Sequence, residues 1–322
     1  MFIVTKALSF LCMTVLLLLC SASHAQDKVR IGNPLDAGLV TFPLAQKRGF
    51  LKQHRVEAEI IRMAGPVATV ALANGEIDYF TGFTASVRAA IRGLPIKVIA
   101  CYLPASPFVL IARPNIKSVK DLRGQTIGFT GEQRGPDLAA RKILEHFGLD
   151  PDHDVKFVRA GATDGRLAAL QQGLITATAV PVPWDFWAKK MNFTVLARAY
   201  ELFSYPEGGL VTTTRKIKEK RDEIKRVIKA GIAANRYIHA ERDGTISFLA
   251  EWLKVDTDLA TATYDPLVKI LNGNGGLPEN GFRTVIESAK AVTNVYREIA
   301  ISEIADLSIL AEAQNELGIK SR

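Results

Sequence analysis

Short apolar or alternating runs and longer helical stretches take turns along this chain of 322 residues. Residues 56–61 alternate apolar and charged side chains, as a half-buried strand does. Residues 96–101 form an apolar, β-branched run that suits a strand buried on both faces. Strands that alternate with short helices indicate parallel sheets and an α/β fold. The first predicted strands are residues 29–31, 56–61, 77–80 and 96–101.

The same order of elements begins a second time, with predicted strands at 126–129, 155–158, 176–180 and 194–197. Two isolated extended segments, 108–112 and 209–213, are predicted to be two crossover hinge strands, and nearly everything from residue 221 onward has helical spacing. The pattern predicts two α/β lobes and a helical C-terminal region, with a ligand held between the lobes. The predicted division is 26–112 for the first part of lobe 1, 113–204 for lobe 2 and 205–322 for the return crossover and the helical remainder of lobe 1.

The first 25 residues have the pattern of an export signal. Lys6 precedes an apolar run over residues 7–20, and small residues occupy Ser23 and Ala25 before a cleavage site. The apolar run is shorter than the about 20 residues that span a bilayer. We therefore expect a periplasmic protein with the signal cleaved after Ala25, and the alternative is a signal retained as a membrane anchor.

Charge and composition narrow the function. The net charge is +8, which favours anionic small molecules or a negative membrane surface, and export argues against nucleic acid as a partner. Cys101 alone remains after the signal, so no internal disulfide is possible. The four histidines after the signal have no metal-ligand spacing, and the chain has no nucleophile elbow and no phosphate loop. We expect a binding protein without catalytic residues, metal or cofactor.

In the first lobe, the candidate ligand contacts lie in loops that follow strands. Gly38, Gly65 and Gly82 would let a ligand approach the backbone closely, although tight strand-to-helix turns would require the same glycines. Asp36 is placed either to hydrogen-bond a polar ligand group or to cap the following helix. The candidates in this lobe are Asp36, Gly38, Gly65, Gly82, Phe83 and Thr84.

In the second lobe, the loop over residues 130–136 precedes a long predicted helix. Free N–H groups at a helix start favour a carboxylate, a sulfonate or a similar anion, and Arg134 would add a two-pronged contact. The alternative for Arg134 is a surface arginine paired with Glu132 or Asp137. Aromatic candidates for the cleft wall follow further along the chain. The candidates from this part of the chain are Thr130, Gly131, Gln133, Arg134, Trp184 and Tyr205.

Four blocks in order carry a family resemblance. They are PLAQKRGFLK at 43–52, ALANGEID at 71–78, SVKDLRGQTIG at 118–128 and AALQQG at 168–173. The chain resembles the solute-binding proteins for sulfonates, nitrate and thiamine precursors. The resemblance implies a two-lobed type II periplasmic binding protein, monomeric, that delivers a small-molecule ligand to an ABC permease at the cytoplasmic membrane. It does not imply which ligand.

Two other functions remain open. One is an enzyme of the same fold, of the thiamine-pyrimidine or menaquinone type. The branch of the family that makes a thiamine pyrimidine depends on a CCCFC motif, which this chain lacks, and export also argues against a cytoplasmic pathway. The other is an exported partner of a sensor, which presents its ligand to a receptor instead of a permease.

Overall fold

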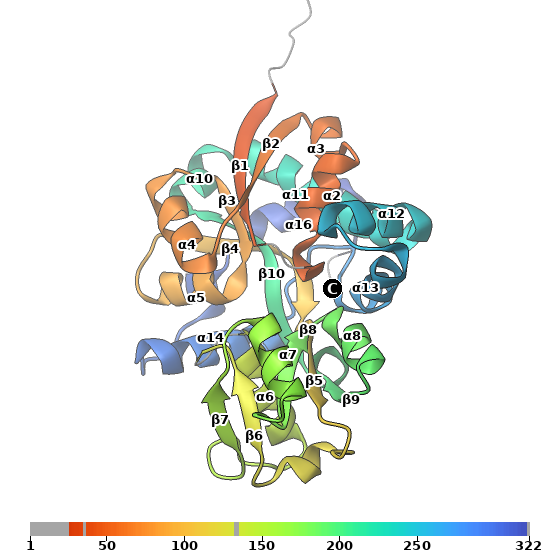
Figure 1. The fold of residues 1–322 in the computed structure, drawn as a ribbon. Coiled ribbons are helices and arrows are strands. Elements are labelled where there is room, and N and C mark those ends of the chain that lie inside the picture. Colours follow the sequence, from red (N-terminus) through yellow and green to blue (C-terminus); the bar gives the residue numbers. More distant parts are fainter. Residues whose placement is uncertain (1–25, 35–36, 132–134, 321–322) are drawn as a thin grey trace, which may run out of the picture.

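The computed structural model describes residues 26–34, 37–131 and 135–320, which form two α/β lobes, each built on a five-stranded sheet (Figure 1). The first sheet has the order β2-β1-β3-β10-β4 and the second the order β7-β6-β8-β5-β9. The strands of the first sheet are β1 (Asp27–Asn33), β2 (Val56–Arg62), β3 (Tyr79–Gly82), β4 (Ile96–Ala105) and β10 (Ser204–Thr213). Those of the second are β5 (Phe108–Ala112), β6 (Thr126–Phe129), β7 (Lys156–Arg159), β8 (Ala177–Pro181) and β9 (Thr194–Arg198).

The two-lobed α/β fold predicted from the sequence is confirmed, with one change in strand direction. The strands β1, β2 and β3 are mutually parallel, as are β6, β7 and β8. By contrast, β10 is antiparallel to both of its neighbours, and so is β5. The sequence pattern predicted parallel sheets, and each sheet in fact also contains one antiparallel strand, β10 or β5. The strands that carry the chain between the lobes enter each sheet against the direction of the others.

The two predicted crossovers are themselves paired strands. Residues 108–112 form β5, which lies between β8 and β9 in the second sheet, and residues 209–213 belong to β10 in the first sheet. Every residue of β5 is buried, as a central strand requires. On the outward path, residues 106 and 107 alone separate β4 from β5, and on the return path the short helix α9 (Ala199–Leu202) lies between β9 and β10.

Strand register shows that the carboxyl ends of the parallel strands in the two sheets face each other. Phe108, the first residue of β5, arrives directly from the first lobe and pairs with Pro181 at the end of β8. In the first sheet, Gly208 lies near the start of β10 and pairs with Gly82 at the end of β3. Loops after parallel strands are where open α/β sheets bind ligands. In this molecule the loops that follow the parallel strands of one sheet lie opposite those of the other sheet.

Helices cover both sheets, and the predicted helical C-terminal region is confirmed (Figure 1). Helix α11 packs against α2 and α16, whereas α14 packs against α5 and β10. In the first lobe the helices are α2 (Thr41–Lys47), α3 (Phe50–Gln53), α4 (Gly65–Asn74), α5 (Phe83–Ile91), α10 (Thr214–Glu219), α11 (Arg221–Ala240), α12 (Arg242–Leu253), α13 (Thr257–Ile270), α14 (Glu279–Thr293), α15 (Ile301–Ile304) and α16 (Ser308–Glu316), with the 3-10 turn η1 (Ala37–Leu39). In the second lobe they are η2 (Val119–Leu122), α6 (Gly135–His146), α7 (Thr163–Gln171), α8 (Trp184–Lys190) and α9. Within the described residues, none of these helices is both long and apolar enough to cross a membrane.

Helix α11 shows how the first lobe forms its core. Ile224, Val227, Ile228 and Ile232 repeat at helical spacing and are fully buried, so one face of the helix packs into the core. Asn235 continues that face as a buried polar residue. Its amide donates to the carbonyls of Tyr102, at 3.1 Å, and Asn272, at 2.7 Å, so the buried amide is satisfied.

Candidate functional site

At the end of β1 and along β10, the edge of the first lobe that faces the second is closely packed. Asn33, at the end of β1, is 4% exposed and accepts a hydrogen bond of 2.7 Å from the hydroxyl of Thr81 in β3. Gly38 is buried in the turn η1 and lines a small cavity of about 10 Å³ beside this pair. A space of that size holds at most about one water molecule. The cavity is lined by Gly38, Leu39, Thr41, Phe42, Thr81, Tyr102, Leu103, Gly208 and Gly209.

Glycines at this edge are required by packing. A β-carbon on Gly209 would meet the backbone of Ala100 and lie 2.7 Å from Cα of Cys101, so β10 approaches β4 too closely for any side chain. The predicted ligand contacts Gly65 and Gly82 have a similar role. Their β-carbons would lie 2.7 Å from Cβ of Ala85 and 2.9 Å from the Phe80 ring. Close packing therefore requires glycine at these two positions, and their role as ligand contacts stays a prediction.

Two aromatic candidates prove to be core residues. Phe83 is 0% exposed and packs edge-to-face on Phe282, with 6.2 Å between ring centroids. Tyr205 is 2% exposed, and burial raises the pKa of its hydroxyl. In this structure neither ring is exposed at the lobe edge, and a ligand contact at these two residues stays a prediction. The spacing of Phe83, Val87 and Ile91 could have shown the burial of Phe83, because all three lie on the buried face of α5.

The second lobe presents a different edge, organised by Arg166. This arginine is in the first turns of α7, is 1% exposed, and all five of its N–H groups have acceptors. Nε donates to the hydroxyl of Thr178 at 3.0 Å, and Nη1 donates to the hydroxyl of Thr130 and to the carbonyl of Gly161. Nη2 donates to the hydroxyl of Thr163 at 3.4 Å and to the carbonyl of Ala179 at 3.1 Å. One side chain thus joins the ends of β6 and β8 to the start of α7.

All five acceptors of Arg166 are neutral oxygens. Burial lowers the pKa of Arg166 to about 10, which leaves the guanidinium charged at neutral pH. Within the described ranges no carboxylate pairs with it. A buried charge without an opposite charge is costly, and proteins that keep one usually use its field. The sequence analysis missed Arg166, although its spacing of four from the buried Leu170 placed it on the inner face of α7.

Among the candidates near α6, the structure places Thr130 and Gly131 directly after β6, beside the Arg166 network. Gly131 is buried and Thr130 is half-buried. Asp36, Gln133 and Arg134 lie outside the described residues.

The start of α6 lies close to a carboxylate of the first sheet. One carboxylate oxygen of Glu207, in β10, accepts from the hydroxyl of Thr84 at 3.3 Å. Its other oxygen would lie 3.6 Å from a β-carbon on Gly135, the first residue of α6. The predicted candidate Thr84 is thereby placed between the lobes. A protein carboxylate, rather than a free helix start, stands at this position.

Trp184, the predicted cleft wall, is the first residue of α8 and follows the end of β8. It is half-buried and packs against the core, so part of its surface stays open at the same edge as Thr130. The neighbouring Trp187 is 41% exposed, and the Nζ of Lys190 lies 5.8 Å from its ring.

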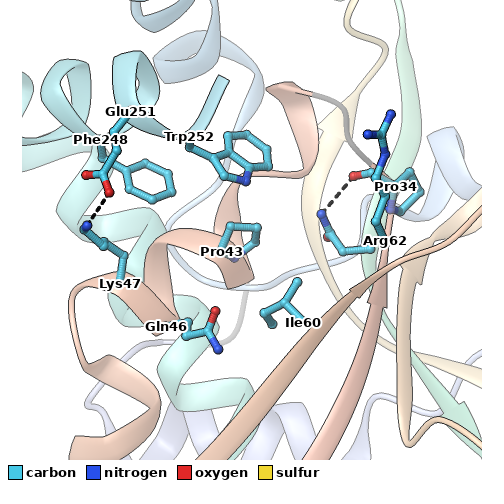
Figure 2. A pocket seen from close by; sticks show the side chains of 10 residues that line it. Pro34, Pro43, Gln46, Lys47, Ile60, Arg62, Phe248, Glu251 and Trp252 are labelled. Atoms are coloured by element: carbon cyan, nitrogen blue, oxygen red, sulfur yellow. Dashed lines mark hydrogen bonds and ion pairs between the residues drawn. The ribbon is translucent and has the colours of Figure 1, made fainter. Parts of the chain in front are cut away.

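A larger cavity, of about 700 Å³, lies on the flank of the first lobe between β1, β2, α2 and α12 (Figure 2). The rings of Phe248 and Trp252 stack on one side of it, with centroids 5.8 Å apart, and Ile60 lies on the other. Lys47 and Glu251 form an ion pair of 2.5 Å at its rim. It is lined by Asn33, Pro34, Pro43, Gln46, Lys47, Ile60, Arg62, Phe248, Glu251 and Trp252. The sequence analysis did not point to this cavity, because its lining comes from segments up to about 200 residues apart.

Metal chemistry has no evident position in the described part of the chain. There, no group of three or more His, Cys, Asp and Glu side chains is arranged to hold a metal ion. Cys101 is fully buried in β4, and burial raises the pKa of its thiol.

Comparison with solved structures establishes the fold as that of a periplasmic binding protein. The periplasmic sulfonate-binding protein SsuA from Methylobacillus flagellatus is 17% identical, with a TM-score of 0.77 over 92% of this chain and 96% of that chain. The desulfurization enzyme DszB is 16% identical, with a TM-score of 0.67 over 90% of this chain and 99% of its own. At these identities the likeness concerns the fold, which is shared by a binding protein and an enzyme.

Comparison of sequences identifies the family. A protein of Haemophilus influenzae assigned to thiamine biosynthesis is 28% identical over 200 residues, which are 59% of this chain and 60% of that relative. The match thus covers less than two thirds of the relative's length. The family model described as NMT1/THI5 like matches residues 38–244, well over half of the chain. The chain therefore belongs to the NMT1/THI5-like family.

Proposed function

We propose that the protein is exported, with residues 1–25 removed after Ala25, and captures a small organic anion between its two lobes for delivery to an ABC importer. One observation carries the proposal. The carboxyl ends of the strands in both sheets face each other, and the edge of the second lobe holds the buried cation Arg166 without a described counter-charge. Such an edge attracts a negative group.

Further support comes from charge and from similar proteins. The net charge of +8 raises the local concentration of anions near the molecule. A protein of the same fold is a sulfonate-binding component of an ABC transporter. On this proposal the protein acts as a monomer, its second partner is the permease at the cytoplasmic membrane, and nucleic acid is not a partner.

A second candidate function is an enzyme that makes or converts a thiamine-type pyrimidine. The match to a relative assigned to thiamine biosynthesis favours it, and the similar fold of DszB is compatible with catalysis. The described side chains offer little for it. Cys101 is buried with a raised thiol pKa, and the described charged groups between the lobes are engaged in hydrogen bonds. We therefore favour binding without turnover.

Calorimetry and mass spectrometry test the choice. The protein without residues 1–25 should be stabilised on heating by an alkanesulfonate or a carboxylate, because a ligand that binds only the folded state stabilises it by mass action. A ligand recovered after incubation should have an unchanged mass. A product of altered mass would support the enzyme, and stabilisation by neutral pyrimidines alone would exclude an anionic ligand.

Tryptophan fluorescence tests the location. Trp184 lies at the edge between the lobes and Trp252 in the flank cavity. If the ligand binds between the lobes, the fluorescence change should disappear in Trp184→Phe and persist in Trp252→Phe. The reverse result would move the site to the flank cavity.

A further inference from the structure

We propose that the negative group of the ligand binds to the hydroxyls of Thr130 and Thr163, with Arg166 as the charge behind them rather than a direct contact. The inference rests on the proposed ligand-binding function and specifies the site within it. It makes Arg166 a positioning residue that sets the preference for an anion.

The first step is that Arg166 has no donor left for a ligand. Its five N–H groups are all used within the protein, and it is only 1% exposed. Its charge is nevertheless present, and in a poorly solvated site it acts over several ångströms with little screening.

The second step concerns the three hydroxyls that accept from Arg166. The hydroxyl of Thr178 donates a hydrogen bond of 2.9 Å to the carbonyl of Gly128, so it has no donor left for a ligand. The hydroxyls of Thr130 and Thr163 accept from Arg166, and among the described residues nothing accepts from them. A hydroxyl that accepts from a cation becomes a stronger donor. Two such donors therefore remain at the surface of the network.

The third step is that both threonines lie at the edge that faces the first lobe and are partly exposed. Thr130 follows β6 and Thr163 begins α7, and each is half-buried. The residue before α7, Ala162, provides no side-chain cap, so backbone N–H groups of the first turn of this nine-residue helix add to the positive end. Asp164, the acidic neighbour of Thr163, is exposed to solvent, where water screens its charge.

The chemistry of these donors indicates the class of ligand group. Two hydroxyl hydrogens and a helix start match an anion with several acceptor oxygens, such as a sulfonate or a carboxylate. The start of α6, which the sequence also offered, has Glu207 beside it. The site on Thr130 and Thr163 has no protein carboxylate within its described hydrogen-bond network.

The test uses butane-1-sulfonate and its neutral counterpart butane-1-sulfonamide as probes, titrated calorimetrically into the protein without residues 1–25. The wild-type protein should bind the sulfonate in preference to the sulfonamide. Because a hydrogen bond to a charged group is worth about 1.5–3 kcal/mol, Thr130→Val should weaken sulfonate binding at least about tenfold. Thr130→Ser, which restores the hydroxyl, should recover most of the affinity. Thr163→Val and Thr163→Ser should repeat the pattern.

Arg166 variants separate charge from structure. Arg166→Lys keeps the charge but not the hydrogen-bond geometry, and it should retain the preference for sulfonate over sulfonamide. Arg166→Met should lose that preference. Arg113→Met is the matched control, because Arg113 is exposed next to the far end of β5. If circular dichroism shows that Arg166→Met does not fold, the variants of Thr130 and Thr163 alone test the inferred site.

Each failure has a distinct meaning. If the wild-type protein binds the sulfonate and neither threonine→Val variant changes the affinity, the inferred site is wrong while the proposed function stands. If the wild-type protein binds both probes equally or only the sulfonamide, the anion preference itself is overturned. If it binds neither probe at probe concentrations up to about 100 mM, both the inferred site and the anionic ligand class fail.

Discussion

The two edges that face each other across the lobes are built from similar strands but hold different chemistry. In the first lobe, the buried pair Asn33 and Thr81 and the glycines of β10 leave space for about one water molecule. In the second, Arg166 gathers hydroxyls and carbonyls from two strands and a helix around a charge that has no carboxylate partner among the described residues. The first edge is closely packed and carries the carboxylate of Glu207 beside the start of α6, and the second is polarised by Arg166.

This difference indicates that the two edges would select a ligand by different properties. A closely packed edge has a fixed shape, because any added atom meets backbone, and so it is suited to exclude molecules by size. On the proposed binding function, the charged network of Arg166 would select by charge instead. The contrast also explains how homologous folds can bind different solutes: the sheet positions the edge, and a few side chains give it its chemistry.

The largest effect is expected from overfilling the first edge. Gly209→Ala places a methyl group against the backbone of Ala100 and Cys101, which cannot move without separating β10 from β4. The free energy of unfolding should fall by about 3 kcal/mol. Urea titration followed by circular dichroism measures it. The control Gly273→Ala meets only the flexible side chain of Arg236 and should cost less than about 1 kcal/mol. Equal costs in the two variants would contradict the close packing.

A smaller effect is expected from emptying the second edge. Arg166→Met removes five hydrogen bonds and leaves buried oxygens, among them the Ala179 carbonyl, without a donor. The loss of an unfavourable buried charge offsets part of the cost, so the free energy of unfolding should fall by about 2 kcal/mol. The exposed Arg113→Met should change it by less than about 0.5 kcal/mol. A variant at position 166 as stable as the parent would mean that the network contributes nothing to folding.

A third change tests the neutral pair of the first edge. Thr81→Val removes the donor to the side-chain amide oxygen of Asn33 and leaves that buried oxygen without this hydrogen bond. A cost of about 1 kcal/mol is expected, since a single neutral hydrogen bond is involved. The same urea titration measures it, with Thr284→Val as control because that hydroxyl bonds only a carbonyl of its own helix. A cost above that of Arg166→Met would reverse the ranking of the two edges.

The sequence predicted the elements well because their patterns are local. The strands β2, β4 and β6 stand where the apolar runs are, and the glycines after helices mark their ends. The site was less predictable. Arg166 is flanked by Gly165 and Leu167, and only the pairing of β6 with β8 brings Thr130 and Thr178 to it from 36 and 12 residues away. Contacts of that range leave no periodic trace in one sequence.

The burial of the aromatic candidate Phe83 has a related, long-range cause. Phe83 follows a strand and opens a helix, as a ligand contact would, but the core against Phe282 takes its ring from 199 residues further along the chain. The same holds for Glu207, whose position near the start of α6 depends on how the lobes sit together. Local position indicated which edge of each sheet the candidates occupy, and burial decided which of their side chains are exposed there.

The smallest expected effects distinguish the lobes by their histidines. His54, in the first lobe, has its pKa lowered by burial and by the nearby Lys229 and Arg226, so it should titrate below about 6.5. His153, in the second lobe, hydrogen-bonds Asp150 at 2.8 Å, which raises its pKa above that value.

The contributions of these two histidines to stability depend on pH with opposite signs. The unfolded chain binds a proton at His54 more readily, so this contribution falls as pH drops below about 6.5. The contribution of His153 is fully present below about 6.5 and is lost as pH rises through its folded pKa. Proton NMR titration of the two imidazoles measures both shifts, with His54→Gln and His153→Gln to assign the signals. Two histidines that titrate together near 6.5 would show that neither environment persists in solution.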